Sequence, residues 1–369
     1  MKIVTIVGAR PQFIKAAAVS RKLQERHEEV LVHTGQHYDY EMSGIFFDGL
    51  ELPQPKASLG VGSGSHGFQT GAMLKAIEDV LLAERPDRVL VYGDTNSTLA
   101  GALAASKLSI PIAHVEAGLR SFNRRMPEEI NRVLVDHLSD SLLCPSETAI
   151  NNLAAAGITE GVHLVGDVML DVLNWAKQRA DAKRSEILER FGLSRQAYLI
   201  ATVHRSENTD EVTRMSNILR ALNAIDEPVV FPVHPRARKI INEMGFHPKP
   251  HVRLLDPVGY VDMVALLGSS RLVLTDSGGL QKEAYWLGVP CLTLRKETEW
   301  VETVGAGWNV LVGSDSSRIV DAVNSYAPPS SHPVLYGDGA AADKCVDLLG
   351  AGYEPMSLAE RAEYANWRQ

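Results

Sequence analysis

Short apolar runs alternate with longer stretches of helical spacing along the first half of the chain. The predicted strands lie at residues 3–7, 30–34, 88–92, 112–115 and 141–144. The predicted helices lie at residues 13–24, 67–84, 99–107 and 127–138. The strands are too apolar to alternate and too short for helices, which is typical of strands buried on both faces. This alternation predicts a parallel, doubly wound α/β sheet with helices on both faces.

The pattern begins again near Asp167 and predicts a second domain. Further strands are predicted at residues 198–203, 229–233, 252–255 and 272–274. Further helices are predicted at residues 172–191, 211–225, 261–267 and 280–287. We therefore expect two Rossmann-like domains, at residues 1–167 and 168–355. A last helix within residues 356–369 has no strand after it and is expected to pack back on the first domain.

Composition narrows the class of protein. A net charge of −8, with 45% apolar and 22% charged residues, argues against nucleic acid or an anionic membrane as partner. The cysteines Cys144, Cys291 and Cys345 are odd in number and scattered, which fits a reducing cytosol without disulfides. The apolar start of the chain is too short for a signal peptide, and no run reaches membrane-spanning length. We expect a soluble, cytoplasmic protein.

The sequence Asp276-Ser277-Gly278-Gly279 lies between a predicted strand and a predicted helix. Such a turn presents backbone N–H groups and a helix dipole to an anion. Glu283 lies one helical turn further on the same face, where a carboxylate suits sugar hydroxyls better than phosphate. Together they suggest the phosphate and ribose of a nucleotide. The alternative is an ordinary helix N-cap with glycines for tight packing.

Unusual polar residues gather where the predicted strands end. They are Arg10, His37, Asp94, Glu116, His204, His234, Asp276 and Ser277. In parallel α/β sheets ligands bind beyond the carboxyl ends of the strands, and two such domains facing each other would enclose a cleft. Arg10 directly follows a buried strand, although Arg10 and Lys15 could also pair with surface acids, and His204 could cap the next helix.

Several cofactor classes are not supported by the motifs. The first turn, G-A-R-P-Q-F, is not the G-x-G-x-x-G of a dinucleotide site, and the second strand ends without an acid to hold a ribose. There is no P-loop motif, and no HExxH or CxxC; His33 and His37 lie across a strand end and a loop. We expect neither NAD nor a metal ion.

Three acids are candidates for chemistry. Asp94 precedes Thr95-Asn96-Ser97, so it could be a helix N-cap instead. Glu116 ends a buried strand, where packing does not explain an acid, and this favours a functional role. Glu128 lies in the first turn of a helix, where a carboxylate also suits the dipole.

Seven blocks resemble the non-hydrolysing UDP-N-acetylglucosamine 2-epimerases. They are G-A-R-P-Q-F-I-K (8–15), T-G-Q-H-Y-D (34–39), Y-G-D-T-N-S-T (92–98), H-V-E-A-G-L-R-S (114–121), P-E-E-I-N-R (127–132), V-H-R-S-E-N (203–208) and T-D-S-G-G-L-Q-K-E-A (275–284). The resemblance covers almost the whole chain in order. It implies the two-domain glycosyltransferase-B fold with the active site between the domains, and interconversion of UDP-GlcNAc and UDP-ManNAc without metal or NAD. It also implies a homodimer that serves bacterial surface polysaccharide synthesis.

The same resemblance implies roles for individual residues. Asp94, Glu116 and Glu128 match the family's catalytic carboxylates, and His204 matches the histidine beside the departing UDP. The residues expected to bind the nucleotide or the rest of the substrate are Arg10, Lys15, His37, Arg120, Arg205, His234, Arg236, Ser277, Gly278, Gly279 and Glu283.

The implied chemistry explains the need for several acids. UDP leaves first, a carboxylate removes the C2 proton, and a proton returns to the opposite face before UDP adds back, so both faces need a proton carrier. Crowded carboxylates are expected to raise one another's pKa, and closure of the domains is expected to exclude water. A glycosyltransferase, a hydrolysing epimerase and a sugar-nucleotide-binding module remain alternatives.

Two departures from the family pattern bear on substrate and regulation. Trp300 stands where many members carry arginine, and it resembles relatives that epimerise UDP-2,3-diacetamido-2,3-dideoxyglucuronate. Arg124 and Arg125 could pair with the carboxylate of that substrate, or could be a solvated charge run. Residue 40 is tyrosine, and the segment 36–42 lacks a second glutamine that some relatives use to bind regulatory UDP-GlcNAc.

Overall fold

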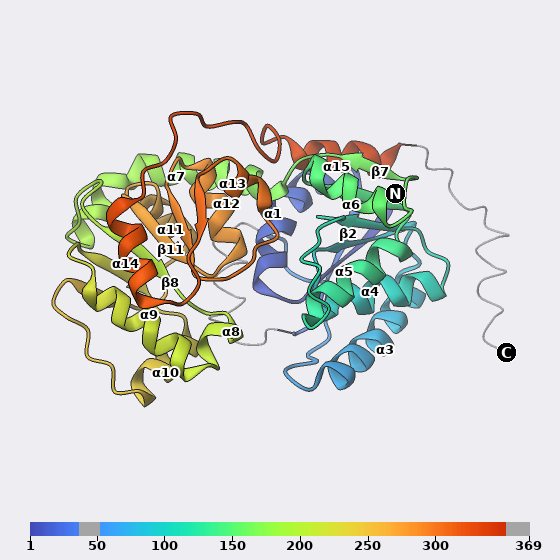
Figure 1. Cartoon of the computed structure of the whole chain (residues 1–369). Helices are drawn as coiled ribbons and strands as arrows, with labels where there is room; N and C mark the ends of the chain where they lie inside the picture. The colour runs from blue at the N-terminus through green and yellow to red at the C-terminus, as the bar shows by residue number, and fades with distance from the viewer. Residues whose placement is uncertain (37–51, 352–369) are drawn as a thin grey trace, which may run out of the picture. The chain divides into compact units, whose positions relative to one another are not determined.

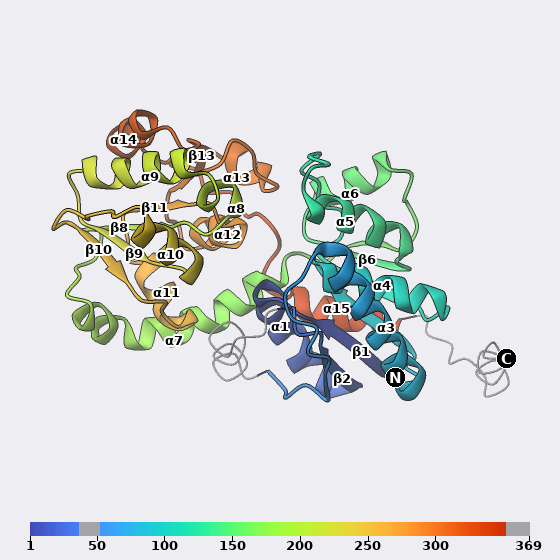
Figure 2. The same ribbon diagram turned by 90° about the horizontal axis from the view of Figure 1, so that it is seen from below.

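The computed structural model describes residues 1–36 and 52–351. The chain divides into two compact units, one comprising Met1–Val172 with Tyr336–Gln369 and the other comprising Leu173–Leu335. In each unit a parallel sheet carries helices on both faces (Figures 1 and 2). The doubly wound α/β class expected from the alternating pattern is therefore confirmed.

The first unit is built on one parallel sheet. Its elements are β1 (Lys2–Val7), α1 (Arg10–Arg26), β2 (Glu28–His33), β3 (Ala57–Ser58), α3 (His66–Glu84), β4 (Arg88–Tyr92), α4 (Asn96–Lys107), β5 (Ile112–Val115), α5 (Pro127–Leu138), β6 (Ser141–Cys144), α6 (Glu147–Ala155), β7 (Val162–Leu164) and α15 (Ala341–Gly350). Helix α7 (Val168–Arg190) begins in this unit and continues in the other. Within the described residues the strand order is β3-β2-β1-β4-β5-β6-β7.

The second unit repeats this plan. Its elements are β8 (Leu199–Thr202), α8 (Ser206–Thr209), α9 (Val212–Ala224), β9 (Val229–Pro232), α10 (Pro235–Glu243), β10 (Val252–Leu255), α11 (Tyr260–Leu267), β11 (Leu272–Thr275), α12 (Gly278–Trp286), β12 (Cys291–Thr293), α13 (Val301–Gly305), β13 (Asn309–Leu311) and α14 (Ser316–Ser325). The strand order within the described residues is β10-β9-β8-β11-β12-β13.

Apolar packing against the sheets holds both units together. In the first, Val4 and Ile6 of β1 are fully buried and lie in one core cluster with Met73 and Ile77 of α3. In the second, α9 and α14 pack on one face of the sheet, while α11 lies on the other (Figure 2). The central strands are covered on both faces, which explains why they are apolar throughout and do not alternate.

The structure differs from the expected elements at short strands, at several helices and at the return of the chain. The helices α6, α8, α10, α13, α14 and α15 were not among the expected elements. The sequence did not identify β7, β12 or β13, which have three residues each; so short a run carries little periodicity. The chain was expected to stay in the second domain to residue 355, but it rejoins the first unit at Tyr336.

Helix α15 accounts for this early return. It packs on α1, where Lys22 lies 3.2 Å from Asp343 and Arg26 pairs with Asp347. The carboxylate of Asp171 also accepts hydrogen bonds from the first backbone amides of the helix, Ala341 (3.2 Å) and Ala342 (3.0 Å). The expected last helix at 356–369 lies outside the described residues.

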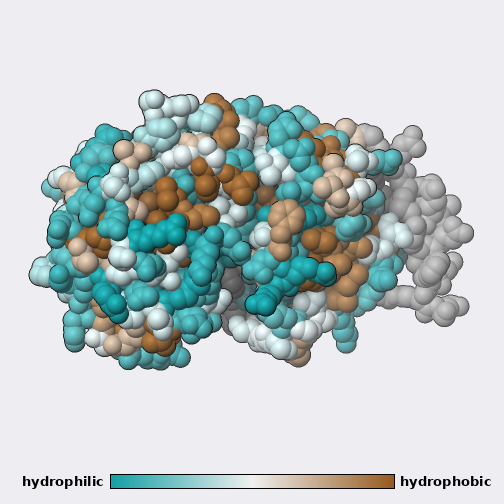
Figure 3. Space-filling view, viewed as in Figure 1, coloured by the Kyte–Doolittle hydropathy of each residue, from teal (hydrophilic) through white to brown (hydrophobic). Residues whose placement is uncertain are grey.

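The face shown in Figure 3 carries hydrophilic residues over much of its area, with hydrophobic residues gathered in several patches between them. Among the described residues no helix is both long and apolar enough to span a bilayer. All three cysteines are free and buried, and burial raises the pKa of Cys144 and of Cys291 to about 12. These thiols are therefore poorly reactive in the folded protein.

Two helical glycines provide a matched test of packing in the first unit. A Cβ on Gly101 of α4 would lie 2.7 Å from Cδ1 of Ile6, whereas a Cβ on the exposed Gly71 of α3 would meet nothing within 4 Å. We expect Gly101→Ala to destabilise the protein by about 1–3 kcal/mol through overpacking. Gly71→Ala should stabilise it by about 0.5–1 kcal/mol, because alanine favours the helix. Urea unfolding of both variants measures this, and the same sign in both would contradict the packing account.

Candidate active site

Several candidate site residues lie at the topological switch point of each sheet. In the first unit β1 connects outward to β2 while its other neighbour, β4, connects towards β5. In the second unit β8 and β11 are neighbours in the same way. At such a point the loops that follow two adjacent strands diverge and leave room for a ligand. The loops concerned carry Asp94 after β4, His204 after β8 and Ser277 after β11.

The turn after β1 is fixed by a buried glutamine. Oε1 of Gln12 accepts hydrogen bonds from the amides of Gly8 (2.8 Å) and Ala9 (3.0 Å), and its Nε2 donates to the carbonyl of Tyr92 (3.0 Å). A Cβ on Gly8 would lie 2.0 Å from Oγ1 of Thr34, so only glycine allows this close approach. The start of α1 is thereby tied to the end of β4.

Lys15, one turn into α1, pairs with Glu116 at the end of β5. Both side chains are buried, at 9% and 7% exposure. Burial alone would lower the pKa of Lys15, but the charges of Glu116 and Asp94 outweigh it, and the pKa is raised. The ammonium group therefore stays charged and favours the ionised form of Glu116.

The backbone at Glu116 is strained. Its φ is +69°, a left-handed conformation that costs non-glycine residues roughly 1–2 kcal/mol. The amides of Glu116 and Ala117 both donate to the carbonyl of Leu143 on β6, at 3.0 and 3.3 Å, which holds the bend in place. Strain of this kind gathers at functional sites. It supports the functional interpretation of Glu116 over simple packing.

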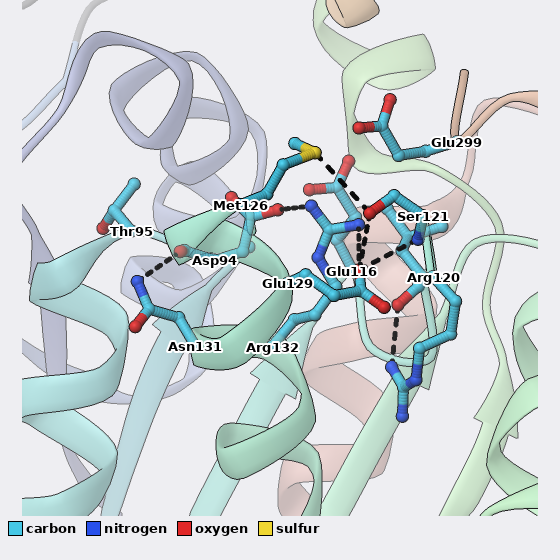
Figure 4. Close-up of polar contacts among 12 residues, drawn as sticks. Asp94, Thr95, Glu116, Arg120, Ser121, Met126, Glu129, Asn131, Arg132 and Glu299 are labelled. Atoms are coloured by element: carbon cyan, nitrogen blue, oxygen red, sulfur yellow. Dashed lines mark hydrogen bonds and ion pairs between the residues drawn. The ribbon is translucent and has the colours of Figure 1, made fainter. Parts of the chain in front are cut away.

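Asp94 is not the N-cap of the helix that follows it. The N-cap of α4 is Thr95, whose Oγ1 accepts a hydrogen bond from the amide of Thr98. The Asp94 carboxylate instead pairs with Arg132 of α5 at 2.5 Å, and its carbonyl accepts from Nδ2 of Asn131 at 2.9 Å (Figure 4). The Asp94 side chain is 27% exposed, so part of it stays accessible beside the buried side chain of Arg132.

The neighbouring acids Glu128 and Glu129 have different surroundings. Glu129 is buried and accepts from the amides of Ser121 (2.9 Å) and Phe122 (3.0 Å), which fixes the loop before α5 (Figure 4). Glu128 lies in the first turn of α5 and is partly exposed. Glu129 therefore fixes the backbone of this loop, whereas the Glu128 carboxylate is partly accessible.

The structure gives less support to a binding role for three of the expected residues. Arg10 is the first residue of α1, and His37 lies outside the described residues. Arg120 is held by Asp136, with Nη1 2.6 Å from Oδ2, and its side chain is only 6% exposed. Arg120 thus supports the loop after β5.

In the second unit a buried carboxylate organises the loop after β8. Asp276 accepts hydrogen bonds from the amides of His204 and Arg205, each at 3.1 Å, and from Nδ2 of Asn208 at 3.0 Å. Nδ1 of His204 lies 3.4 Å from the same carboxylate. The N-cap of α8 is Arg205, so His204 does not cap that helix. The contact with Asp276 orients the ring of His204, whose side chain is 37% exposed.

The start of α12 combines an N-cap with the expected cluster of backbone amides. Oγ of Ser277 accepts from the amide of Leu280 at 3.4 Å, and the helix begins at Gly278. A Cβ on Gly278 would lie 3.0 Å from Nε1 of Trp300 and 3.7 Å from Nη2 of Arg205. Two N–H-bearing side chains therefore border a helix N-terminus, an arrangement suited to an anion.

Three further expected residues have partners within the second unit. Glu283 is buried and accepts from the hydroxyl of Tyr260 at 2.9 Å. His234 caps α10 by accepting from the amide of Arg236 at 3.2 Å, and its ring lies 5.6 Å from that of His204. Arg236 is exposed and pairs with Asp210 at 2.6 Å.

Sequence reasoning missed the residues that hold these groups in place. Gln12, Arg132 and Asp136 lie inside or beside recognised motifs, yet their partners are distant in sequence. Lys282, fully buried with its ammonium 3.6 Å from the ring centre of Trp300, was also missed. The only signal for Lys282 in the sequence was a charged residue on an otherwise apolar face of the predicted helix.

Comparison with known proteins then identifies the family. Residues 21–350 match the model of the UDP-N-acetylglucosamine 2-epimerase family. A UDP-N-acetylglucosamine 2-epimerase homolog of Methanococcus maripaludis is 54% identical, over 95% of this chain and 99% of the relative. A UDP-2,3-diacetamido-2,3-dideoxy-D-glucuronate 2-epimerase of Pseudomonas aeruginosa is 51% identical, over 95% and 99%.

Solved structures agree with this result. The crystal structure of Methanocaldococcus jannaschii UDP-GlcNAc 2-epimerase in complex with UDP-GlcNAc and UDP is 42% identical, with a TM-score of 0.89 over 95% of this chain and 100% of that one. A calicheamicin glycosyltransferase, at 15% identity and a TM-score of 0.52, resembles this chain in fold alone. The expected glycosyltransferase-B class is confirmed. The chain belongs to the UDP-N-acetylglucosamine 2-epimerase family and is an isomerase of the UDP-sugar 2-epimerase class.

Proposed function

We propose that this protein interconverts UDP-GlcNAc and UDP-ManNAc by elimination and re-addition of UDP. The observation that carries the proposal is the set of acids at the switch point of the first unit, where Asp94 and Glu116 each face a buried cation. These acids lie in sequence blocks that resemble the family, whose model matches residues 21–350, and a relative was crystallised with UDP-GlcNAc and UDP.

The proposed reaction moves one proton and one leaving group in each direction. The C1–O bond breaks, UDP leaves with the bonding electrons, and a carboxylate takes the C2 proton, which gives a glucal. UDP then re-forms the bond at C1 while a second acid delivers a proton to the opposite face of C2. Asp94, Glu116 and Glu128 are the proposed proton carriers. Lys15 and Arg132 form ion pairs with two of them, Glu116 and Asp94, and so hold their carboxylates in place.

The second unit supplies the proposed binding groups for UDP. The amides at Gly278 and Gly279 and the dipole of α12 stabilise the diphosphate, which carries its greatest charge when C1–O breaks. Arg205 lies beside this helix start, and His204 is held by Asp276. Both are proposed to donate hydrogen bonds to the leaving UDP. Glu283 is the proposed acceptor for ribose hydroxyls.

A second substrate is favoured by specific observations. The Pseudomonas relative is named for UDP-2,3-diacetamido-2,3-dideoxy-D-glucuronate, and Trp300 resembles that branch. In this chain Trp300 borders the start of α12, where a change of side chain would alter what the substrate contacts. Epimerisation at C2 is the same in both cases, so the candidates differ only in the sugar.

The setting of the enzyme is also part of the proposal. We propose a cytoplasmic homodimer that supplies a UDP-2-acetamido sugar for surface polysaccharide synthesis. The resemblance to the family supports these points, and size-exclusion chromatography with light scattering tests the dimer. The segment 36–42, with Tyr40, falls mostly among residues that are not described, so the expectation from its missing glutamine that substrate does not regulate the enzyme stays a prediction from sequence.

One experiment separates the proposed activity from its alternatives. The protein is incubated in D2O with UDP-GlcNAc, and in parallel with the diacetamido uronate, and C2 is followed by NMR. Deuterium at C2 of an intact UDP-sugar is the expected result, in whichever sugar is the substrate. Release of free ManNAc would indicate a hydrolysing enzyme. No exchange with either sugar would refute the proposal and favour a glycosyltransferase or a binding module.

Removing either paired acid should stop proton transfer but spare the nucleotide. We expect Asp94→Asn and Glu116→Gln to lower C2 exchange by about 100-fold or more, as for loss of a general acid or base. UDP affinity, measured by calorimetry, should change by less than about threefold, because no UDP-binding group is removed. As a matched control, Asp140→Asn alters a carboxylate that holds the amide of Ile112 at the opposite end of β5. Normal exchange in both acid variants would contradict their assignment.

A methyl group at the start of α12 should weaken UDP binding selectively. In Gly278→Ala the Cβ lies 3.0 Å from Nε1 of Trp300 and takes up space beside the amides. We expect UDP affinity to fall roughly tenfold, about the worth of one hydrogen bond to a charged group. Gly259→Ala, at the N-cap of α11 with nothing within 4 Å, is the control and should bind UDP normally. Equal affinities in the two variants would place the nucleotide elsewhere.

A further inference from the structure

A buried charged network connects the two loops that carry the paired acids. His114 of β5 is fully buried; its Nδ1 lies 2.9 Å from Oδ1 of Asp136, and its Nε2 lies 2.7 Å from the carbonyl of Gly93. Asp136 of α5 also accepts from Nη1 of Arg120 (2.6 Å) and from the amide of Gly118 (3.3 Å). None of these residues except Arg120 was expected to have a function.

The hydrogen bonds fix the orientation of the histidine ring. A backbone carbonyl can only accept, so Nε2 of His114 donates to Gly93. Asp136 receives hydrogen bonds from Arg120 and Gly118 as well; although burial alone would raise its pKa, the contacts with His114 and Arg120 lower it. The ring of His114 is therefore held on both sides, by Gly93 and by Asp136, with no exposed surface.

The position of the His114 ring indicates what it does for the two acids. Gly93 has φ +60°, and a Cβ there would lie 3.2 Å from Nζ of Lys15 and 3.3 Å from Oε2 of Glu116. Asp94 follows Gly93 directly, and Glu116 lies two residues after His114 on the strand. The bond from His114 to the Gly93 carbonyl therefore holds the turn that carries Asp94 next to the end of β5, where Glu116 lies.

A buried charge cluster is a costly way to obtain stability. Desolvation offsets most of the attraction between buried ions, and apolar side chains of similar size often stabilise a core at least as well. What the cluster provides instead is a single geometry, because each donor and acceptor must be satisfied in one arrangement. Productive proton transfer depends on such geometry within fractions of an ångström.

We propose that His114, held between Gly93 and Asp136, acts with Asp136 as a positioning residue that sets Asp94 relative to Glu116. Its catalytic readout rests on the function proposed above. This role requires no contact between these two residues and the substrate. Both side chains are fully buried.

Three substitutions separate the bonds of this network. His114→Asn keeps a donor towards Asp136 and loses the bond to Gly93, whereas His114→Gln keeps a donor towards Gly93 and loses the bond to Asp136. We expect kcat to fall about 100-fold in His114→Asn and about tenfold in His114→Gln, because misplacement by about an ångström costs about that much. Asp136→Asn should also lower kcat. In all three, KM and UDP affinity should stay within about threefold of the wild type, since the ground-state contacts are kept.

The control distinguishes positioning from stability. Asp140→Asn removes a carboxylate acceptor, 2.8 Å from the amide of Ile112, at the far end of the same strand. Activity is measured per folded protein, well below each variant's unfolding temperature. Asp140→Asn should lose stability and keep its kcat. If His114→Asn behaves like Asp140→Asn, with an unchanged kcat, the positioning role is overturned.

A spectroscopic measurement tests the bond to Gly93 without any substrate. In the ¹⁵N-labelled protein, Nε2 of His114, assigned with His114→Gln, should carry a proton that exchanges slowly with D2O, because it donates to a buried carbonyl. An Nε2 without a proton would overturn the assignment. If no UDP-sugar exchanges its C2 proton with the wild type, the proposed function fails, and the NMR result still decides whether His114 bonds to Gly93.

Discussion

Parallel strands impose one constraint on which the rest of this structure depends: the carboxyl ends of all strands in a sheet lie along one edge. In both units the polar residues expected from the sequence lie in loops at that edge, beside β1 and β4 in the first and beside β8 and β11 in the second. Some amides that follow these strands bond to side chains instead of a neighbouring strand. The amide of Gly8 donates to Gln12, and the amide of His204 donates to Asp276. The scaffold and the site are therefore one arrangement.

The first unit pairs its acids with buried basic side chains. Glu116 faces Lys15, Asp94 faces Arg132, and Asp136 faces His114 and Arg120. Each of these acids therefore has at least one basic partner of its own. A proton carrier paired in this way can change charge when a phosphate or a sugar alters the pairing. The left-handed backbone of Glu116 adds a local cost that only a well-packed surrounding can sustain.

The second unit fixes its helix start by neutral hydrogen bonds instead. The amide of Trp300 donates to Thr298 at 3.2 Å, and its carbonyl accepts from Thr303 at 2.8 Å. Gln281 of α12 and Asn309 of β13 join the same buried network. The indole beside Gly278 is therefore anchored at its backbone, and its face rests on the ammonium of Lys282. A rigid side chain at this point suits discrimination between substrates.

Much of the outline could be read from the chain itself. Apolar runs at β1, β4 and β11 are long enough to identify buried strands, and a polar residue directly after such a run can only lie at the sheet edge. The three-residue strands β7, β12 and β13 carry too little pattern, and the early return at Tyr336 depends on packing between α15 and α1. Motif position likewise indicated Asp94, Glu116 and Ser277 as site residues.

The sequence by itself determined the fold class, the family and the loops in which the candidate chemistry lies, because these follow from local periodicity and contiguous motifs. Only the tertiary structure decided the partners: Arg132 for Asp94, Lys15 for Glu116, and His114 with Asp136 beneath both. Such pairs join residues from different strands and helices, separated by tens of positions. Whether a charge is exposed, paired or held in one orientation depends on which elements pack together, and local sequence carries no record of that.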